Sequence, residues 1–138
     1  GTSFGTSPVQ VKLYNTGPFV YLHAKPIRLI TDGMSNTIFV GEIVDGHTPE
    51  SRNIWSFAFR HESVYRTTEN PLNTMPGQGS AFVSYGTLVN SAFASRHPGG
   101  CNFVFGDGRV RLLSESISLD TYRALSTIAQ SEVVSLVE

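Results

Sequence analysis

Short apolar runs separated by turn residues dominate the chain, and their length and alternation are typical of strands rather than of long helices. Alternating or β-branched runs predict strands over four segments in the first half of the chain and strand-like segments in two later ones. These are Val9–Tyr14, Phe19–Leu22, Thr37–Val44, Asn53–Arg60, 81–84 and 87–94. Pro26 can start a short helical turn over Ile27–Asp32, which Gly33 can close in a left-handed conformation.

The most informative local pattern is a hairpin over residues 101–114. Asp107-Gly108 lies between two apolar runs, and an Asp-Gly pair in that position is the strongest short-range hairpin signal. Only these two residues separate Gly106 from Arg109, so we expect a tight turn in which Gly108 has a positive φ.

A helix is predicted over Leu119–Ala129. Ser118 is a favourable N-cap, Asp120 suits the positive end of the helix, and Ile117 and Tyr122 occupy the staple positions. The apolar stripe that could pack on a sheet consists of Leu119, Tyr122, Leu125, Ile128 and Ala129. We expect an α+β fold, mainly antiparallel β, with this C-terminal helix packed on the sheet. The tail Val133–Val137 could add an edge strand.

The length of 138 residues is typical of a single domain, here 1–138. Residues 1–8 are rich in Gly, Ser and Thr and are expected to form a flexible lead-in. Residues 67–80 are interpreted as a long loop, a kind of segment in which function is often located.

Charge and cysteine content exclude several classes of function. A net charge of −1 with 15% charged residues predicts neither nucleic-acid binding nor a basic surface for lipids. The single Cys101 can form neither an internal disulfide nor a cysteine-type zinc site. No segment approaches the roughly 20 apolar residues of a membrane span, and no signal peptide is visible. Because the chain begins with Gly1 rather than Met, we interpret it as a processed or trimmed piece.

His97 and Asp107 invite a catalytic or metal-binding interpretation. With a strand between them, they would lie roughly 15–20 Å apart, whereas a His–carboxylate dyad needs about 3 Å. We therefore interpret Gly99-Gly100 and Asp107-Gly108 as turn residues that supply positive φ, and we expect His97 to hydrogen-bond a backbone carbonyl or a loop. A ligand role for His97 is the alternative.

Further candidates also have structural explanations. Asp32, Gly33 and Asn36 lie in an oxygen-rich stretch that could bind Ca²⁺, although a helix C-cap with an Asx-type turn explains it better. Glu42 could pair with an arginine or bind a backbone amide. Cys101 begins an apolar strand, where a thiol is usually a small buried hydrophobe.

The remaining aromatic and imidazole groups do not converge in the sequence. His23, His47 and His61 lie in separate segments without the spacing of a zinc motif. Trp55, with Phe57 and Phe59, could form a sugar-stacking platform, but such runs are more often part of a core. We predict no catalytic residue, no cofactor and no metal.

Three blocks of the sequence, in this order, resemble one known family. They are Ile-Thr-Asp-Gly-Met-Ser-Asn-Thr-Ile-Phe-Val-Gly-Glu (30–42), the stretch 95–113 with His97, nine residues and Asp107-Gly108, and the C-terminal segment 122–135. Together they resemble the planctomycete prepilin-like proteins of unknown function, which are named for this His–Asp-Gly motif.

The resemblance implies a pseudopilin-like globular domain that faces the periplasm or the cell surface. Such proteins carry a prepilin-type leader and one long apolar helix, which anchors them in the membrane or packs into a fibre, as in type II secretion pseudopilins. That helix is missing here, and the family supplies no catalytic residues. The resemblance predicts a non-enzymatic structural protein whose partners are other pilin-like subunits or secretion components. The alternative is an extracytoplasmic ligand-binding module, for carbohydrate for example, that uses Trp55 and the 67–80 loop.

Overall fold

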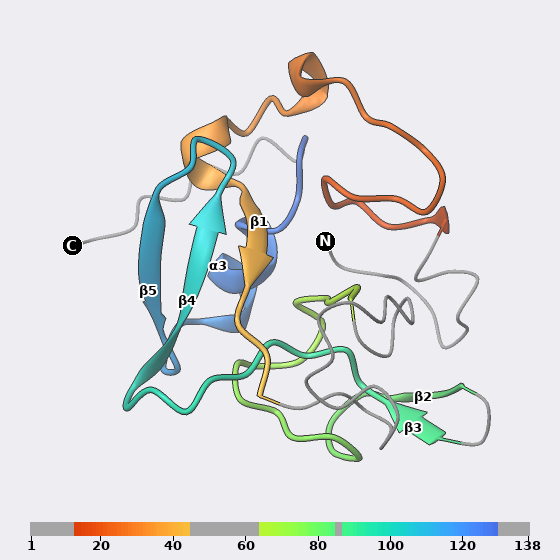
Figure 1. The fold of residues 1–138 in the computed structure, drawn as a ribbon, viewed down its shortest axis with the longest axis vertical. Coiled ribbons are helices and arrows are strands. Elements are labelled where there is room, and N and C mark those ends of the chain that lie inside the picture. Colours follow the sequence, from red (N-terminus) through yellow and green to blue (C-terminus); the bar gives the residue numbers. More distant parts are fainter. Residues whose placement is uncertain (1–12, 45–63, 85–86, 130–138) are drawn as a thin grey trace.

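A three-stranded antiparallel sheet with a short helix against one face forms the centre of the protein (Figure 1). The computed structural model describes residues 13–44, 64–84 and 87–129. The strands of this sheet, in spatial order, are β1 (Ile38–Gly41), β4 (Gly100–Phe105) and β5 (Val110–Ser114), and the helix is α3 (Leu119–Ala124). The predicted α+β class with antiparallel strands is confirmed.

Smaller elements surround this centre. The chain enters β1 through two 3₁₀ turns, η1 (Ile27–Leu29) and η2 (Met34–Asn36). A separate antiparallel hairpin is made by β2 (Phe82–Ser84) and β3 (Thr87–Val89). None of the helices in the described part of the chain has the length and apolar character needed to cross a membrane.

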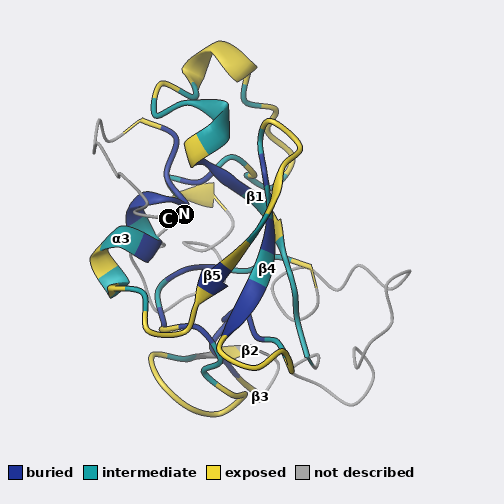
Figure 2. Ribbon diagram, turned by 90° about the vertical axis from the view of Figure 1, so that its left-hand side faces the viewer, coloured by how far each residue is buried: buried dark blue, intermediate teal, exposed yellow. Residues whose placement is uncertain are grey.

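The core lies between the sheet and α3, as the burial colours show (Figure 2). Phe103 of β4 is fully buried, and its ring packs edge-on against Phe93 at 5.1 Å and against Tyr122 of α3 at 6.0 Å between centroids. The other buried members of this cluster are Ile38, Leu72, Cys101, Phe105, Leu113 and Leu125. In β1, Gly41 lies opposite Phe103, and a Cβ atom there would overlap the rings of Phe103 and Phe93. The close approach of these rings therefore requires a glycine at position 41.

The turn between β4 and β5 is a hairpin, as predicted, but it is one residue longer than expected. The Gly108 N–H donates to the Phe105 carbonyl at 2.9 Å, and the Phe105 N–H donates to the Arg109 carbonyl at 2.9 Å. Gly108 has φ +86°, which confirms the predicted positive φ, whereas neither Gly106 nor Asp107 has one. The loop therefore has three residues, Gly106, Asp107 and the left-handed Gly108, rather than two residues with positive φ angles.

The helix begins where the sequence predicts and ends five residues earlier. The Ser118 side chain accepts a hydrogen bond from the Thr121 N–H at 3.2 Å, which confirms the N-cap. After Ala124, the side chains of Ser126 and Thr127 donate to the carbonyls of Arg123 and Ala124 and so compete with helical bonding. The carbonyl of Leu125 accepts instead from Ile38 of β1 at 2.7 Å. Tertiary hydrogen bonds therefore end the helix before the predicted Ala129.

Four other predictions of secondary structure need correction. Phe19–Leu22 is a tight turn with an isolated Val20–His23 bridge and a positive φ at Leu22, not a strand. The helical turn expected over Ile27–Asp32 ends at Leu29, and the strand expected over Thr37–Val44 covers only β1. The segment predicted as a strand over 87–94 leaves strand geometry after Val89.

Several predictions concern residues outside the described part of the chain. They are the lead-in 1–8, almost all of the strand Val9–Tyr14, the strand Asn53–Arg60 with Trp55, and the tail Val133–Val137.

The segment 67–80 contains no helix or strand, and two buried asparagines organise it. The Asn70 amide donates to the carbonyls of Ser80 at 2.9 Å and Asn90 at 3.2 Å, and its oxygen accepts from the Ser80 N–H at 2.7 Å. The Asn90 amide nitrogen faces the carbonyls of Thr74, Met75 and Gln78 at 3.3, 2.6 and 3.0 Å. Side-chain amides thus replace the regular ladders that a strand or helix would supply.

Candidate functional site

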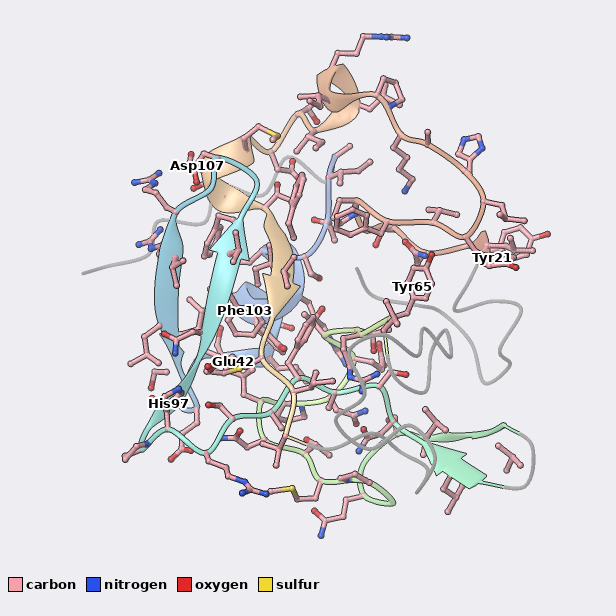
Figure 3. All side chains as sticks on the ribbon, viewed as in Figure 1. Tyr21, Glu42, Tyr65, His97, Phe103 and Asp107 are labelled. Atoms are coloured by element: carbon pink, nitrogen blue, oxygen red, sulfur yellow. The ribbon has the colours of Figure 1, made fainter. Side chains whose placement is uncertain are left out.

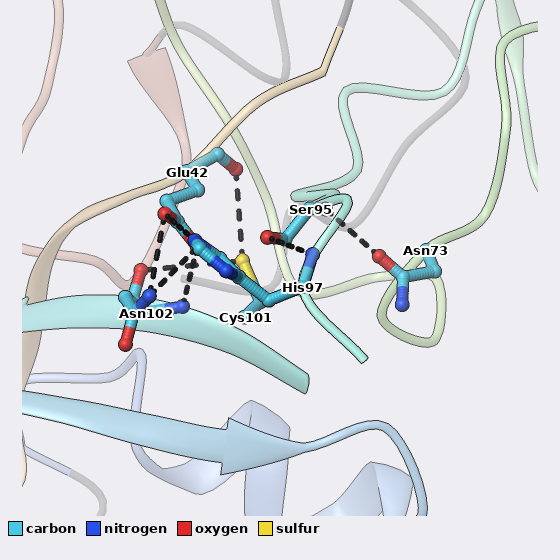
Figure 4. A network of polar contacts seen from close by, with 6 residues as sticks. All are labelled: Glu42, Asn73, Ser95, His97, Cys101 and Asn102. Atoms are coloured by element: carbon cyan, nitrogen blue, oxygen red, sulfur yellow. Dashed lines mark hydrogen bonds and ion pairs between the residues drawn. The ribbon is translucent and has the colours of Figure 1, made fainter. Parts of the chain in front are cut away.

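The densest polar cluster surrounds Glu42, which follows directly after β1 (Figure 4). Its carboxylate accepts a hydrogen bond from the Asn102 N–H at 2.7 Å, and both carboxylate oxygens lie 3.3 Å from the Asn102 side-chain amide. The Glu42 backbone pairs with the same residue, because its N–H donates to the Asn102 carbonyl at 3.2 Å. Glu42 thus holds the end of β1 against the start of β4. Of the two partners that the sequence suggested for Glu42, an arginine or a backbone amide, the structure shows the backbone amide.

His97 joins this cluster from the segment that precedes β4. Its Nε2 lies 3.0 Å from Oε1 of Glu42, so its partner is a side chain in the loop that follows β1, which was one of the two expectations, and not a backbone carbonyl. The His97 N–H donates to Oγ of Ser95 at 3.1 Å, and the Ser95 N–H donates to the Asn73 side chain at 2.9 Å. The cluster therefore connects β1, β4 and two loops.

The environment stabilises the charged form of Glu42. The Asn102 backbone N–H is the main cause that lowers the pKa of the Glu42 carboxyl to about 2, with smaller contributions from the side chains of Asn102, Ser95 and His97. Partial burial opposes this shift. Glu42 is ionised at every pH near neutrality, so it can accept hydrogen bonds there but cannot act as a general acid.

Cys101 lies beside Glu42 but does not have the character of a nucleophile. It is fully buried, its thiol faces the Glu42 carbonyl at 3.8 Å, and burial raises the pKa of the thiol to about 11. A nucleophilic cysteine needs the opposite shift, because the thiolate is the reactive form. Its role is packing, as the sequence suggested.

Asp107 is remote from His97, as Figure 3 shows: the two residues lie at opposite ends of β4. The Asp107 carboxylate accepts from the Arg109 backbone N–H at 3.0 Å and from Arg109 Nε at 2.7 Å. These bonds lower its pKa and close the hairpin turn.

The glycines that accompany this motif have different functions. Gly99 has φ +79° and supplies the expected turn. Gly100 does not have a positive φ and belongs to β4, so that expectation was wrong. A Cβ atom at Gly100 would meet the Leu113 carbonyl of the neighbouring strand, which explains the glycine by close approach.

The block around Asp32, Gly33 and Asn36 forms a second local structure. Gly33 has φ +92° and is the N-cap of η2, so it precedes a helical turn and does not close the expected one. The Asn36 side chain donates to the Asp32 carbonyl at 3.2 Å, and Thr37 Oγ1 donates to the Gly33 carbonyl at 3.0 Å. Side-chain donors therefore bind the carbonyls of Asp32 and Gly33 and hold this turn together. Among residues 13–44, 64–84 and 87–129, no group of three or more His, Cys, Asp or Glu side chains could hold a metal ion.

Two hollows border these elements. One, of about 410 Å³, is an open depression beside His97 and Glu42, lined also by Ser95, Arg96 and Ala94. The other, of about 480 Å³, is mainly apolar and lies between β1, the loop with Phe19 and the segment 64–67. The Phe19 and Phe39 rings meet edge-on there at 5.4 Å between centroids. Trp55, the predicted ligand contact, lies outside the described residues.

Sequence reasoning missed Asn73, Ser95 and Asn102 as members of the Glu42 cluster. Asn73 is far from the others in the chain and has φ +63°, and no spacing in the sequence links it to them. Asn102 interrupts an apolar strand, and a polar residue at such a position was the one available signal.

The fold and the cluster define a small α+β domain whose most connected polar residues hold strands and loops together. The chain belongs to a family described as a protein of unknown function (DUF1559), whose model matches residues 10–120. No curated protein and no solved structure matches the chain. The family assignment gives the domain relatives without giving it an activity.

Proposed function

We propose that this domain is the exposed, non-enzymatic part of a pilin-like assembly outside the cytoplasm, and that its partners are other pilin-like subunits. The full-length protein would be held in the membrane by a prepilin-type helix. Two supports are the resemblance of the blocks 30–42, 95–113 and 122–135 to prepilin-like proteins and the exposed face of the central sheet.

The outer face of the sheet is the observation that carries the proposal. Val40 of β1 lies opposite Val104 of β4, and Val104 lies opposite Val110 of β5, so their side chains form a row on the face away from α3. Val40 and Val110 are 57% and 65% exposed, and Leu112, the next residue of β5 on this face, is 57% exposed. Contiguous apolar surface of this kind marks a protein contact site.

The Glu42 cluster supports a structural function over a catalytic one. Its carboxylate is committed to the backbone and side chain of Asn102 and to His97, and the neighbouring thiol of Cys101 is buried and protonated. An enzyme site needs polar groups that converge on a space for substrate. Although an open depression of about 410 Å³ lies beside them, Glu42 and His97 bind each other, and Glu42 also binds Asn102, so that they fix the base of the apolar face.

Photocrosslinking in the natural host tests the proposal. A photoreactive amino acid at Val40 in the full-length protein should give adducts with other envelope subunits, identified by mass spectrometry. The matched control carries the same photoreactive amino acid in place of Asp120, which lies in α3 on the opposite side of the sheet. This control should give no adducts. The proposal would be overturned if no adducts formed at Val40, or if the protein were recovered in the cytoplasmic fraction.

A ligand-binding module is the second candidate, favoured by the apolar hollow of about 480 Å³ beside β1. The chain has a single tryptophan, Trp55, so its fluorescence can be titrated with oligosaccharides without interference. A saturable change would favour ligand binding, and calorimetric titration of Trp55→Ala, which has no tryptophan signal, should then show weakened binding. An unchanged spectrum is expected from an assembly domain.

A further inference from the structure

β5 is an edge strand, and its outer side faces no other strand in the part of the chain that the structure describes (Figure 1). It is five residues long, and two of its side chains, Val110 and Leu112, are more than half exposed. An edge with apolar side chains and unpaired backbone groups is a template for another strand.

The hydrogen bonds at both ends of the β4–β5 ladder show which backbone groups are unpaired. The Phe105 N–H donates to the Arg109 carbonyl, and the Glu115 N–H donates to the Gly99 carbonyl, each at 2.9 Å. Because hydrogen-bonded and non-hydrogen-bonded pairs alternate in an antiparallel ladder, the odd-numbered residues of β5 face β4. The N–H and C=O groups of Val110 and Leu112 and the N–H group of Ser114 therefore point to the open edge, whereas the Ser114 carbonyl accepts from the Ile117 N–H at 3.1 Å.

We infer that β5 pairs with β5 of a second copy of this chain, antiparallel and centred on Leu112. This inference deepens the proposed function and rests on it, because it names the partner and the strand that binds it. A two-fold axis at Leu112 places Leu112 opposite Leu112 and Val110 opposite Ser114. Leu112 then exchanges two backbone bonds with Leu112 of the second copy, and each Ser114 N–H donates to the Val110 carbonyl opposite, which makes about four bonds in total.

The charges next to β5 favour this register. With Leu112 at the axis, Arg109 lies opposite Glu115 of the second copy, and the same pair recurs at the other end. Both side chains are exposed in the single chain. A register centred on Val110 would instead place Arg109 opposite Arg111, and like charges directly opposite each other are destabilising. The Arg109–Glu115 pairs therefore favour a second copy of this chain as the partner and Leu112 as the centre of the register.

Sedimentation velocity over a concentration series tests whether the chain forms the dimer. The 138-residue chain should shift from monomer to dimer between about 10 μM and about 1 mM, the range of a weak contact. Leu112→Lys, which brings two lysines together at the axis, should leave it monomeric. Val83→Lys is the matched control, since Val83 is 61% exposed in the other hairpin, and this variant should dimerise normally.

Charge reversal tests the register. Arg109→Glu and Glu115→Arg should each weaken the dimer roughly tenfold, because each creates like-charge pairs at both ends. The double variant should restore it. Each reversal also removes a contact within the chain, with Asp107 or with Asn73, and the double variant removes both. Loss of those contacts cannot produce a rescue.

The outcomes separate this inference from the proposed function. The pairing of β5 would be overturned if the chain stayed monomeric at every concentration, or if Leu112→Lys did not weaken the dimer. Adducts at Val40 in cells would still support the proposed function in either case. Failure of the double variant to recover the dimer would overturn the register. Thermal unfolding of each variant checks that the fold is retained.

Discussion

Glu42 connects more of the molecule than any single pattern in the sequence indicated. It lies just past β1, yet its carboxylate binds the Asn102 N–H at 2.7 Å and His97 at 3.0 Å. Hydrogen bonds to a charged acceptor are stronger than neutral ones, so the residue fixes the place where β1, β4 and the loop before β4 meet.

The depressed pKa of Glu42, about 2, predicts an acid-sensitive contribution to stability. The folded-state pKa lies below the unfolded value, so the contribution is complete above about pH 5 and is lost as the pH falls toward 2. Glu42→Gln should lower the free energy of unfolding by about 1–2 kcal/mol at neutral pH and flatten its decline in acid. Urea unfolding at a series of pH values measures both effects.

His97→Ala is the matched comparison for that experiment. The backbone N–H of Asn102 is the largest cause of the shift and His97 the smallest, so removal of His97 should change the acid dependence much less. Equal effects of the two substitutions would contradict this ranking of causes.

Gly108 gives a second prediction at this scale. Its φ is +86°, and no atom lies within 4 Å of the place where a Cβ would be, so a substitution acts through backbone strain alone. Gly108→Val should lower stability by roughly 1–3 kcal/mol in thermal or urea unfolding. Gly108→Asn should cost less, because asparagine tolerates the left-handed region. An unchanged melting curve for Gly108→Val would contradict the inference that this turn requires a left-handed backbone at position 108.

Among the secondary-structure elements, local signals predicted starts and turns better than ends. The hairpin of β4 and β5 and the Ser118 cap depend on residues close together in the sequence, and both were predicted. The end of α3 depends on the bond from Ile38 to the Leu125 carbonyl, which joins residues far apart in the chain. Single-sequence periodicity contains no information about such contacts.

In the candidate site, too, the sequence indicated local features but not the contacts between distant segments. Glu42 was recognised as a residue that could bind a backbone amide, and His97 as part of a motif, but nothing in their spacing predicted that they pair with each other. Their contact depends on the pairing of β1 with β4, which is a property of the tertiary fold.

The long segment 67–80 gives a prediction that the sequence alone could not have made. The Asn90 amide nitrogen faces three carbonyl oxygens within 3.3 Å, and its side-chain oxygen accepts from the Ala92 N–H. Asn90→Asp would place a carboxylate against those carbonyls and should lower stability by about 3 kcal/mol. Urea unfolding provides the measurement.

Gln78→Glu is the control for this loop, because it adds the same charge on an exposed side chain of the same segment. It should change the free energy of unfolding by less than about 0.5 kcal/mol. If both variants lost the same stability, net charge rather than the buried amide would be the cause.

For the whole molecule, the central sheet has two different faces and an open edge. One face packs against α3 and contains Phe103 and Phe105, whereas the other presents Val40, Val104 and Val110. The Glu42 cluster fixes one end of the exposed face and the Asp107 turn the other. We propose that a domain built in this way acts by contact, and that copies of it meet through this face and the β5 edge.

Nuclear magnetic resonance on the isotope-labelled chain tests that claim most directly. At low concentration, the N–H groups of Val110, Leu112 and Ser114 should exchange rapidly with solvent, because they point to the open edge. At high concentration, exchange at these three amides should slow and the methyl signals of Val110 and Leu112 should shift, with the Val83 methyls unchanged. Rapid exchange of the three amides and constant methyl signals at every concentration would contradict it.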